Sequence, residues 1–122
     1  MKDFILSLFK KEKISFKHLT YIFCSDKYLK DLNKRFLNHN FYTDILTFKI
    51  SGEDEPIVSE IYISTERVLE NSKKFEQSYD SELLRVVIHG ALHLCGYKDD
   101  TAKNKKIMRG KEDYYLETWR ST

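Results

Sequence analysis

Residues 83–99 read LLRVVIHGALHLCGYKD, the longest apolar run of the chain followed by a short polar segment. The twelve residues 83–94 leave almost no polar face at helical spacing, which is typical of a helix buried on nearly every side. His89 and His93 stand four positions apart, so they share one face of that helix, one turn above the other. Buried polar groups are costly without partners. The run therefore predicts a central buried helix whose two imidazoles bind something.

A metal ion is the partner that the next residues suggest. Gly96 can adopt the left-handed conformation that ends a helix. Asp99 could then turn back toward His89 and His93, and Asp100 is the neighbouring alternative. Three protein ligands with one open position are the usual arrangement of a catalytic zinc site. We therefore expect one zinc ion here, although two hydrogen-bonded core histidines would explain the same pattern without a metal.

The spacing H-x-x-x-H-x-x-G-x-x-D is also that of the metzincin peptidases, whose motif is H-E-x-x-H-x-x-G-x-x-H. Position 90 is glycine here, where those enzymes carry the glutamate that acts as general base. Position 99 is aspartate, where they carry histidine. The spacing thus favours a metal site, while Gly90 argues against classical peptide hydrolysis.

Length and composition predict one soluble domain over residues 1–122. No segment approaches the apolar length of a membrane span, and no signal peptide is evident, so we expect a cytoplasmic protein without membrane contact. Lys and Arg outnumber Asp and Glu by nine to four in residues 1–39 and by six to three in residues 101–122. In residues 40–100 the acids lead, twelve to six. Basic ends around an acidic middle would suit a nucleic-acid substrate, but from charge alone ordinary solvated helix faces are the favoured explanation.

Apolar periodicity and turn residues predict a small α+β arrangement around the central helix. The two predicted strands 43–50 and 57–64 flank a short polar loop with glycine and proline, so they should form an antiparallel hairpin. Each holds an acid in an otherwise apolar setting: Asp44 and Glu60. These acids either lie at exposed or capping positions or support the metal site. The other expected elements are a helix over 3–12, a strand over 18–24, a helix from Ser25 or Asp26 to 37, a helix from Ser64 or Thr65 to 77, a start of the central helix capped by Asp80 or Ser81, and a last helix to 119 capped by Thr101.

Three blocks of the sequence resemble the YbeY family of rRNA maturation factors, which are metal-dependent endoribonucleases. Residues 89–97, HGALHLCGY, match the family pattern H-G-x-L-H-L-x-G-Y. Residues 43–48, TDILTF, resemble its T-D-V-L-S-F, and residues 59–64, SEIYIS, resemble its G-D-I-x-I-S. Gly90, which does not fit the peptidases, is the residue that this family carries.

The resemblance implies a zincin-like α/β fold, with a mixed sheet of three to four strands packed on helices and the metal helix across it. It also implies one zinc ion and activity on single-stranded RNA, in the processing of 16S rRNA ends of the small ribosomal subunit and in ribosome quality control. The expected partners are therefore ribosomal RNA and the small subunit, and the protein is expected to be a monomer. The metal ligands would be His89, His93 and Asp99. Asp44, Glu60 and Lys98 would support the metal or the substrate, and no general base can be named.

This chain departs from the family at three points. Asp99 replaces the third histidine ligand, the family's arginine after Leu-Asn falls at Leu37, and the first family strand is shortened or absent. Two other functions therefore stay open at this point. One is a metal-dependent hydrolase of another substrate, such as a peptide. The other is a ribosome assembly factor that binds RNA without cutting it.

Overall fold

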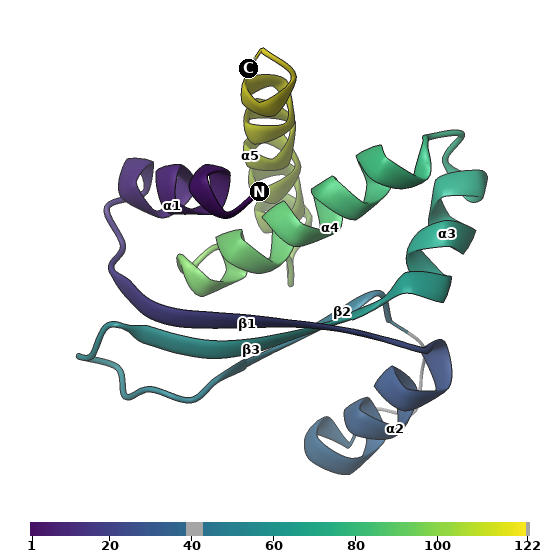
Figure 1. Cartoon of the computed structure of the whole chain (residues 1–122), viewed down its shortest axis with the longest axis horizontal. Coiled ribbons are helices and arrows are strands. Elements are labelled where there is room, and N and C mark those ends of the chain that lie inside the picture. The colour runs from purple at the N-terminus through teal and green to yellow at the C-terminus, as the bar shows by residue number, and fades with distance from the viewer. Residues whose placement is uncertain (39–42, 122) are drawn as a thin grey trace.

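The computed structural model describes residues 1–38 and 43–121. Its elements follow one another as helix, strand, helix, two strands and three helices (Figure 1). Their bounds are α1 Lys2–Lys11, β1 Phe16–Cys24, α2 Asp26–Leu37, β2 Ile45–Lys49, β3 Ile57–Ser64, α3 Thr65–Lys74, α4 Tyr79–Leu94 and α5 Ala102–Arg120.

The three strands form one mixed sheet in the order β1-β3-β2. β3 pairs with β1 in parallel and with β2 antiparallel, so the predicted hairpin and the predicted mixed sheet are confirmed. The hairpin register sets Ile45 opposite Ile63 and Thr47 opposite Ile61. Because side chains alternate across a strand, these four residues share one face of the sheet.

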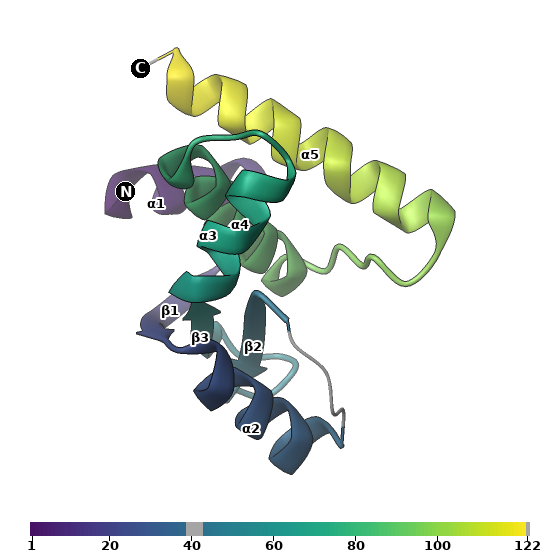
Figure 2. The same ribbon diagram turned by 90° about the vertical axis from the view of Figure 1, so that its right-hand side faces the viewer.

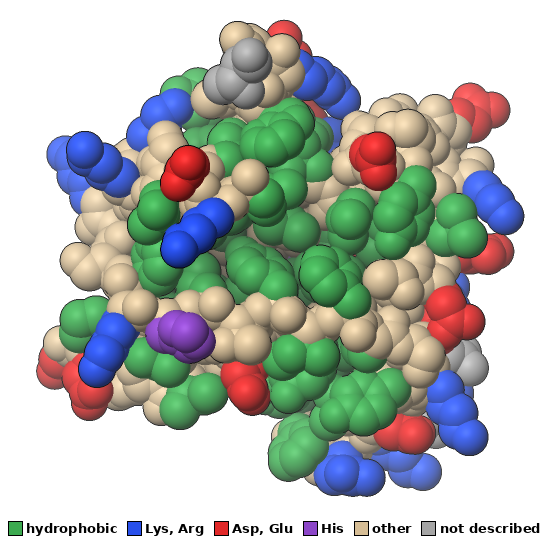
Figure 3. Space-filling model, in the orientation of Figure 1, with side chains coloured by type: hydrophobic (Ala, Val, Ile, Leu, Met, Phe, Trp, Pro, Cys, Tyr) green, Lys and Arg blue, Asp and Glu red, His purple; other side chains and the backbone are tan. Residues whose placement is uncertain are grey.

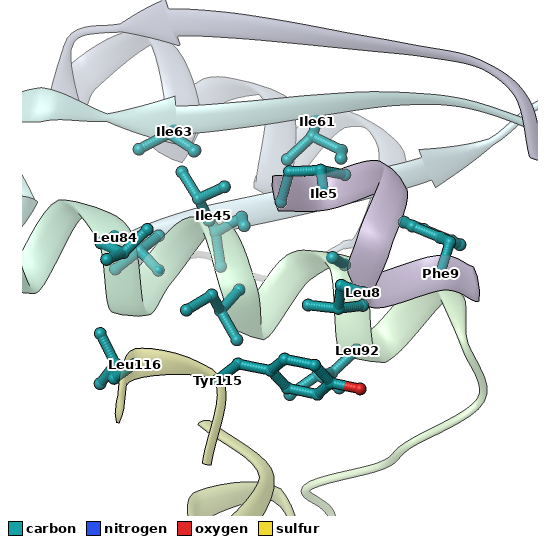
Figure 4. Packing of buried hydrophobic residues seen from close by; sticks show 14 of the residues in the cluster. Ile5, Leu8, Phe9, Ile45, Ile61, Ile63, Leu84, Leu92, Tyr115 and Leu116 are labelled. Carbon is teal, nitrogen blue, oxygen red and sulfur yellow. The ribbon is translucent and has the colours of Figure 1, made fainter. Parts of the chain in front are cut away.

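Helix α4 lies across that face and forms the main core, as the sequence predicted (Figures 1 and 2). Figure 4 shows isoleucines of the sheet on one side of α4 and side chains of α1 and α5 on its other sides. Ile61 and Ile63 from β3 and Ile88 and Leu92 from α4 have no exposed surface. Burial of such side chains contributes about 1.5–3 kcal/mol each.

Among the described helices, α2 is the one that covers the opposite face of the sheet (Figure 2). Leu29 and Leu32 of α2 pack there on Leu46 of β2, in a small second cluster. Half-buried Phe48 and Tyr62 close its edge. The sheet therefore has a thickly covered face toward α4 and a thinly covered face toward α2.

At position 90, α4 lies close against the sheet. A Cβ atom built on Gly90 would lie 2.6 Å from Cδ1 of Ile45 and 3.6 Å from Cγ2 of both Ile61 and Thr47. Distances below 3.0 Å require the neighbouring atoms to move. Gly90 thus allows the helix to settle on the strands, and its backbone faces the core.

The helix starts follow hydroxyl caps. Ser25, Ser64 and Thr101 accept the capping bonds of α2, α3 and α5, as predicted. The predicted cap of α4 at Asp80 or Ser81 is wrong, because the Ser78 hydroxyl accepts from the backbone N–H of Ser81. Asp80 instead lies in the first turn, where a carboxylate suits the helix dipole.

Helix α3 ends at Lys74, a few residues before the predicted end near residue 77. Among the described residues no helix is both long and apolar enough to cross a membrane.

We predict that Gly90→Val destabilises the protein by about 1–3 kcal/mol, because the added carbons overpack the contact with β2 and β3. The matched change is Gly110→Ala on the exposed side of α5, where nothing lies within 4 Å of the added Cβ. It should stabilise the protein by about 0.8–1 kcal/mol through helix propensity. Urea unfolding of both variants measures the two effects, and an equally stable Gly90→Val variant would contradict the close packing.

Candidate metal centre

Two helical turns and one loop bring three possible metal ligands together. His89 and His93 come from successive turns of α4, and Asp99 comes from the loop that follows this helix. Oδ2 of Asp99 lies 3.2 Å from Nε2 of His89 and 3.5 Å from Nε2 of His93. One ligand atom from each residue falls within 4.8 Å of the others.

The second nitrogen of each imidazole is already engaged, and this fixes the ring. Nδ1 of His89 lies 2.6 Å from Oε2 of Glu112, and Nδ1 of His93 lies 2.9 Å from the backbone oxygen of Tyr97. A carboxylate and a carbonyl only accept hydrogen bonds, so both Nδ1 atoms donate. In the neutral rings the lone pairs are then on the Nε2 atoms, which face Asp99.

This donor set fits a divalent metal ion. Tetrahedral zinc with bonds of 2.0–2.1 Å separates its ligand atoms by roughly 3.3 Å, close to the distances between Asp99 and the two imidazoles. Two imidazoles and one carboxylate also leave a fourth position free for a water or a substrate oxygen. The group of His89, His93 and Asp99 could therefore hold one ion.

Glu112 is the acid that holds His89, and it comes from the last helix. Its side chain is only 6% exposed, and its Oε1 accepts from Nη1 of Arg85 at 2.8 Å. Burial alone would raise the pKa of Glu112, but hydrogen bonds from His89 and Arg85 outweigh it and hold the pKa below its ordinary value. Burial likewise would lower the pKa of His89, yet Glu112 and nearby carboxylates raise it. Two cationic or polar donors thus keep a buried carboxylate ionised.

The loop that carries Asp99 is anchored to both ends of the chain. It begins at Gly96, whose φ of +102° is a conformation that other residues rarely adopt. The Tyr97 hydroxyl then donates to Glu12 at 2.6 Å. Tyr115 and Lys111 of α5 donate to the same carboxylate, which lies at the end of α1. Tyr97 therefore binds Glu12 through its hydroxyl and His93 through its carbonyl.

The neighbouring candidates for the third ligand take other roles. Asp100 is exposed and its Oδ1 accepts from the side chain of Asn104 at 2.7 Å, at the start of α5. Cys95 packs against the main core, and burial raises its pKa to about 12. Of the alternatives considered from the sequence, the structure brings Asp99 to the histidines.

A cavity of about 540 Å³ opens beside the three side chains. Asp44 and Lys98 line it, as does Leu37 at the end of α2. Burial raises the pKa of Asp44 above its ordinary value, although His89 opposes that effect. The predicted supporting residues Asp44 and Lys98 therefore lie at the cavity, and the position that resembles the family's arginine presents an aliphatic side chain there.

Glu60 is different, because it lies on the other face of the sheet. It pairs with Phe48 in the hairpin register and is absent from the described lining of the cavity. Its carboxylate accepts from the Tyr62 hydroxyl at 3.3 Å. The prediction that Glu60 supports the metal site is therefore not met, since strand alternation turns it toward α2. A further histidine of the chain, His39, lies outside the described residues.

Sequence reasoning missed Glu112 and Glu12. A signal for Glu112 was present, because it follows Met108 by four residues and precedes Tyr115 by three, on the apolar face of α5. An acid on a buried face requires a partner. Glu12 had no such signal, since its partners lie more than 80 residues away in the chain.

The chain is similar to a well-defined group of proteins. The family model described as Endoribonuclease YbeY matches residues 1–120. A protein named Endoribonuclease YbeY from Cytophaga hutchinsonii is 47% identical over 116 residues, which cover 95% of this chain and 81% of that protein. One of the same name from Karelsulcia muelleri is 46% identical over 112 residues, or 92% of this chain and 79% of that protein. A solution structure of a Thermotoga maritima protein matches with a TM-score of 0.68 at 39% identity, covering 98% of this chain and 81% of that one.

We predict that Glu112→Gln weakens metal binding by about 10–100-fold, because His89 loses the charged acceptor that orients it. Competition with a metal-binding dye measures this affinity. The matched control is Asp113→Asn, which also removes a bond to Arg85 at 2.8 Å but does not touch His89. Equal metal affinity in both variants would show that Glu112 does not orient the site.

Glu12→Gln tests the anchoring of the loop through pH. Burial alone would raise the pKa of Glu12, but hydrogen bonds from Tyr115, Tyr97 and Lys111 hold it below its ordinary value of 4.5. A lowered folded-state pKa means that the charge stabilises the fold above about pH 4.5 and that this gain is lost as pH falls through the folded-state value. The variant should therefore be about 1–2 kcal/mol less stable at pH 7, with a gap that narrows below pH 4.5.

Urea unfolding over a pH series checks this, with the exposed change Glu70→Gln as control. A gap for Glu12→Gln that stays constant down to acid pH would contradict the role of the charge.

Proposed function

This chain belongs to the YbeY family, and on that premise we propose that it is a metal-dependent endoribonuclease that cuts single-stranded RNA. Support comes from the match over residues 1–120 and from relatives of that name at 40–47% identity. The observation that carries the proposal is the convergence of His89, His93 and Asp99 at an open cavity. His89 and His93 also belong to the segment that most resembles the family pattern, residues 89–97.

The substrate that we propose is ribosomal RNA of the small subunit, with action at the ends of 16S rRNA and in ribosome quality control. This substrate would place the protein in the cytoplasm, and two unbonded cysteines agree with such a compartment. All three candidate ligands come from one chain, so we propose that a monomer, one domain over residues 1–122, forms the complete site.

Zinc is the ion that we propose, because imidazole nitrogens and a carboxylate in tetrahedral spacing suit it well. Nε2 of His89, Nε2 of His93 and the Asp99 carboxylate would hold it. When bound, such an ion can lower the pKa of a water and withdraw charge from a phosphate oxygen. Glu112 and the Tyr97 carbonyl would hold the two rings in the tautomer that this requires.

The chain's own residues would then bind and orient the RNA phosphate. Lys98 is the one cation among the described residues that line the cavity, so it is our candidate for charge stabilisation of the phosphate. Asp44 also lines the cavity, and we assign it to support of the substrate or the ligands. Leu37 cannot supply a positive charge, which leaves that task to Lys98.

A peptidase suits this chain less well than a nuclease, because position 90 lacks the acidic side chain that peptide hydrolysis would use. The metzincin motif needs a glutamate there as general base. A Cβ atom at position 90 would lie 2.6 Å from Cδ1 of Ile45, so a glutamate there would have to displace that side chain. The packing of α4 on the sheet therefore favours glycine over that base.

The proposal predicts that His93→Ala lowers RNA cleavage by at least about a hundredfold. Removal of a residue that only hydrogen-bonds to a metal ligand already weakens metal binding by about 10–100-fold, and His93 is itself a proposed ligand. Zinc-loaded protein and the variant are incubated with structured ribosomal RNA, and metal content is measured in the same samples. His18→Ala, in β1 and outside the cavity lining, is the control.

Equal cleavage by wild type and His93→Ala would overturn the nuclease, and unchanged metal content would overturn the metal site. RNA binding without cleavage by the zinc-loaded wild type would identify a non-catalytic assembly factor instead. Turnover of peptides by that same sample would identify a hydrolase of another substrate.

A further inference from the structure

Four aromatic rings form a row on the side of the sheet away from α4. Phe36 of α2 meets Phe48 of β2 with ring centroids 5.9 Å apart, and Phe48 meets Tyr62 of β3 at 5.7 Å. Tyr28, at the start of α2, lies 6.4 Å from Tyr62. We call Phe36, Phe48, Tyr62 and Tyr28 the aromatic row.

The row is more exposed than the packing of α2 requires. Phe36 is 61% exposed and Tyr28 is 50% exposed. The small cluster under α2 is made by three leucines and is closed by Phe48 and Tyr62. The ring of Phe36 therefore adds little to that core. Large aromatic surfaces left open in this way mark sites of interaction.

The row begins at the rim of the metal cavity. Phe36 precedes Leu37, which lines the cavity. Leu46 lines it as well, and Phe48 and Tyr62 pack on the cluster to which Leu46 belongs. Figure 2 shows the end of α2 and strand β2 on the same side of the molecule as the loop that follows α4. A chain bound at the cavity would meet Phe36 first and could continue along the row.

Positive charge surrounds the row. Figure 3 shows hydrophobic and basic side chains together over α2, with acidic ones among them, at the lower right of that view. Arg35 lies 6.0 Å from the centre of the Phe36 ring, and Lys34 is exposed in the same helical turn. The cations of α2 and β2 are Lys27, Lys30, Lys34, Arg35 and Lys49.

Two acids oppose these cations from the same elements. They are Asp31 on α2 and Glu60 on β3, whose carboxylate accepts from the Tyr62 hydroxyl. The other acid of α2 is Asp26, which is paired with Arg67 at 2.7 Å. On α2, β2 and β3 together, five cations thus stand against three acids, which suits a polyanion.

From these observations we propose that the aromatic row is a platform on which unpaired bases of single-stranded RNA stack as the strand leaves the metal cavity. Aromatic faces beside basic side chains are the usual means of binding single strands, since every base offers a π face. Bases inside a duplex are already stacked, so the platform selects single strands. This proposal rests on the proposed function and adds how the substrate is bound.

The test compares two exposed phenylalanines. Phe36→Ala removes one ring of the row, while Phe75→Ala removes a ring that is 54% exposed on α3, beside Lys74. Binding of a labelled oligoadenylate of about ten nucleotides is measured by fluorescence anisotropy. Binding is measured with the zinc-loaded wild type and with each of the two variants. The two variants are then measured again with His93→Ala added to each.

We expect Phe36→Ala to weaken binding of the single strand by about tenfold and Phe75→Ala to leave it unchanged. Neither change should alter binding of a duplex of the same length. Equal single-strand affinity in the Phe36→Ala and Phe75→Ala proteins would overturn the platform and would leave the row to a protein partner.

Stacking can be measured directly by tryptophan fluorescence. The double variant Phe36→Trp, Trp119→Phe has a single indole, which lies at the rim of the cavity. Stacked adenines should quench its fluorescence as the oligonucleotide is added. Fluorescence unchanged at saturating oligonucleotide would also overturn the proposal.

The two proposals fail in different ways. If the zinc-loaded wild type binds RNA through Phe36 but does not cut it, the nuclease proposal fails and the platform stands. If it cuts RNA and Phe36→Ala changes neither binding nor KM, the platform fails and the nuclease stands.

Discussion

The hydrogen bond between His89 and Glu112 joins the two helices on which the candidate metal centre depends. Helix α4 is apolar on nearly every side, so its histidines need polar partners that the helix cannot provide. Glu112 of α5 is one of them, and Arg85 balances the charge that this carboxylate brings into the interior. Loss of one member of such a buried group leaves the others uncompensated. The position of α5 on α4 and the orientation of the His89 ring are therefore fixed by the same contact.

Most of the fold could be predicted from local pattern. The hydroxyl caps at Ser25, Ser64 and Thr101, the hairpin and the buried central helix all depend on residues that are close in sequence. The cap of α4 was misplaced because Ser78, Asp80 and Ser81 all have capping side chains. Only the backbone conformation tells which of them precedes the helix: Ser78 is extended.

The candidate site could be predicted only in its local part. His89, His93 and Asp99 lie within eleven residues, whereas Glu112 and Glu12 reach the site from the far ends of the chain. Glu60 shows a second limit. Alternation along a strand divides its residues into two faces, but which face meets α4 depends on long-range packing. The arginine that the resemblance calls for at position 37 is a third case, because no local pattern shows what takes over its charge.

The last helix supplies the partner of His89, so the metal site can form only late in the synthesis and folding of the protein. A chain leaves the ribosome with its N-terminus first. Helix α4 leaves the ribosome before Glu112 and Tyr115 do, so at that stage both histidines lack the groups that orient His89 and anchor the loop. A pre-organised ion site can then exist only after α5 has docked on α4. Metal capture would follow that docking, and a protein that lacks α5 would keep the histidine motif without the contacts that orient it.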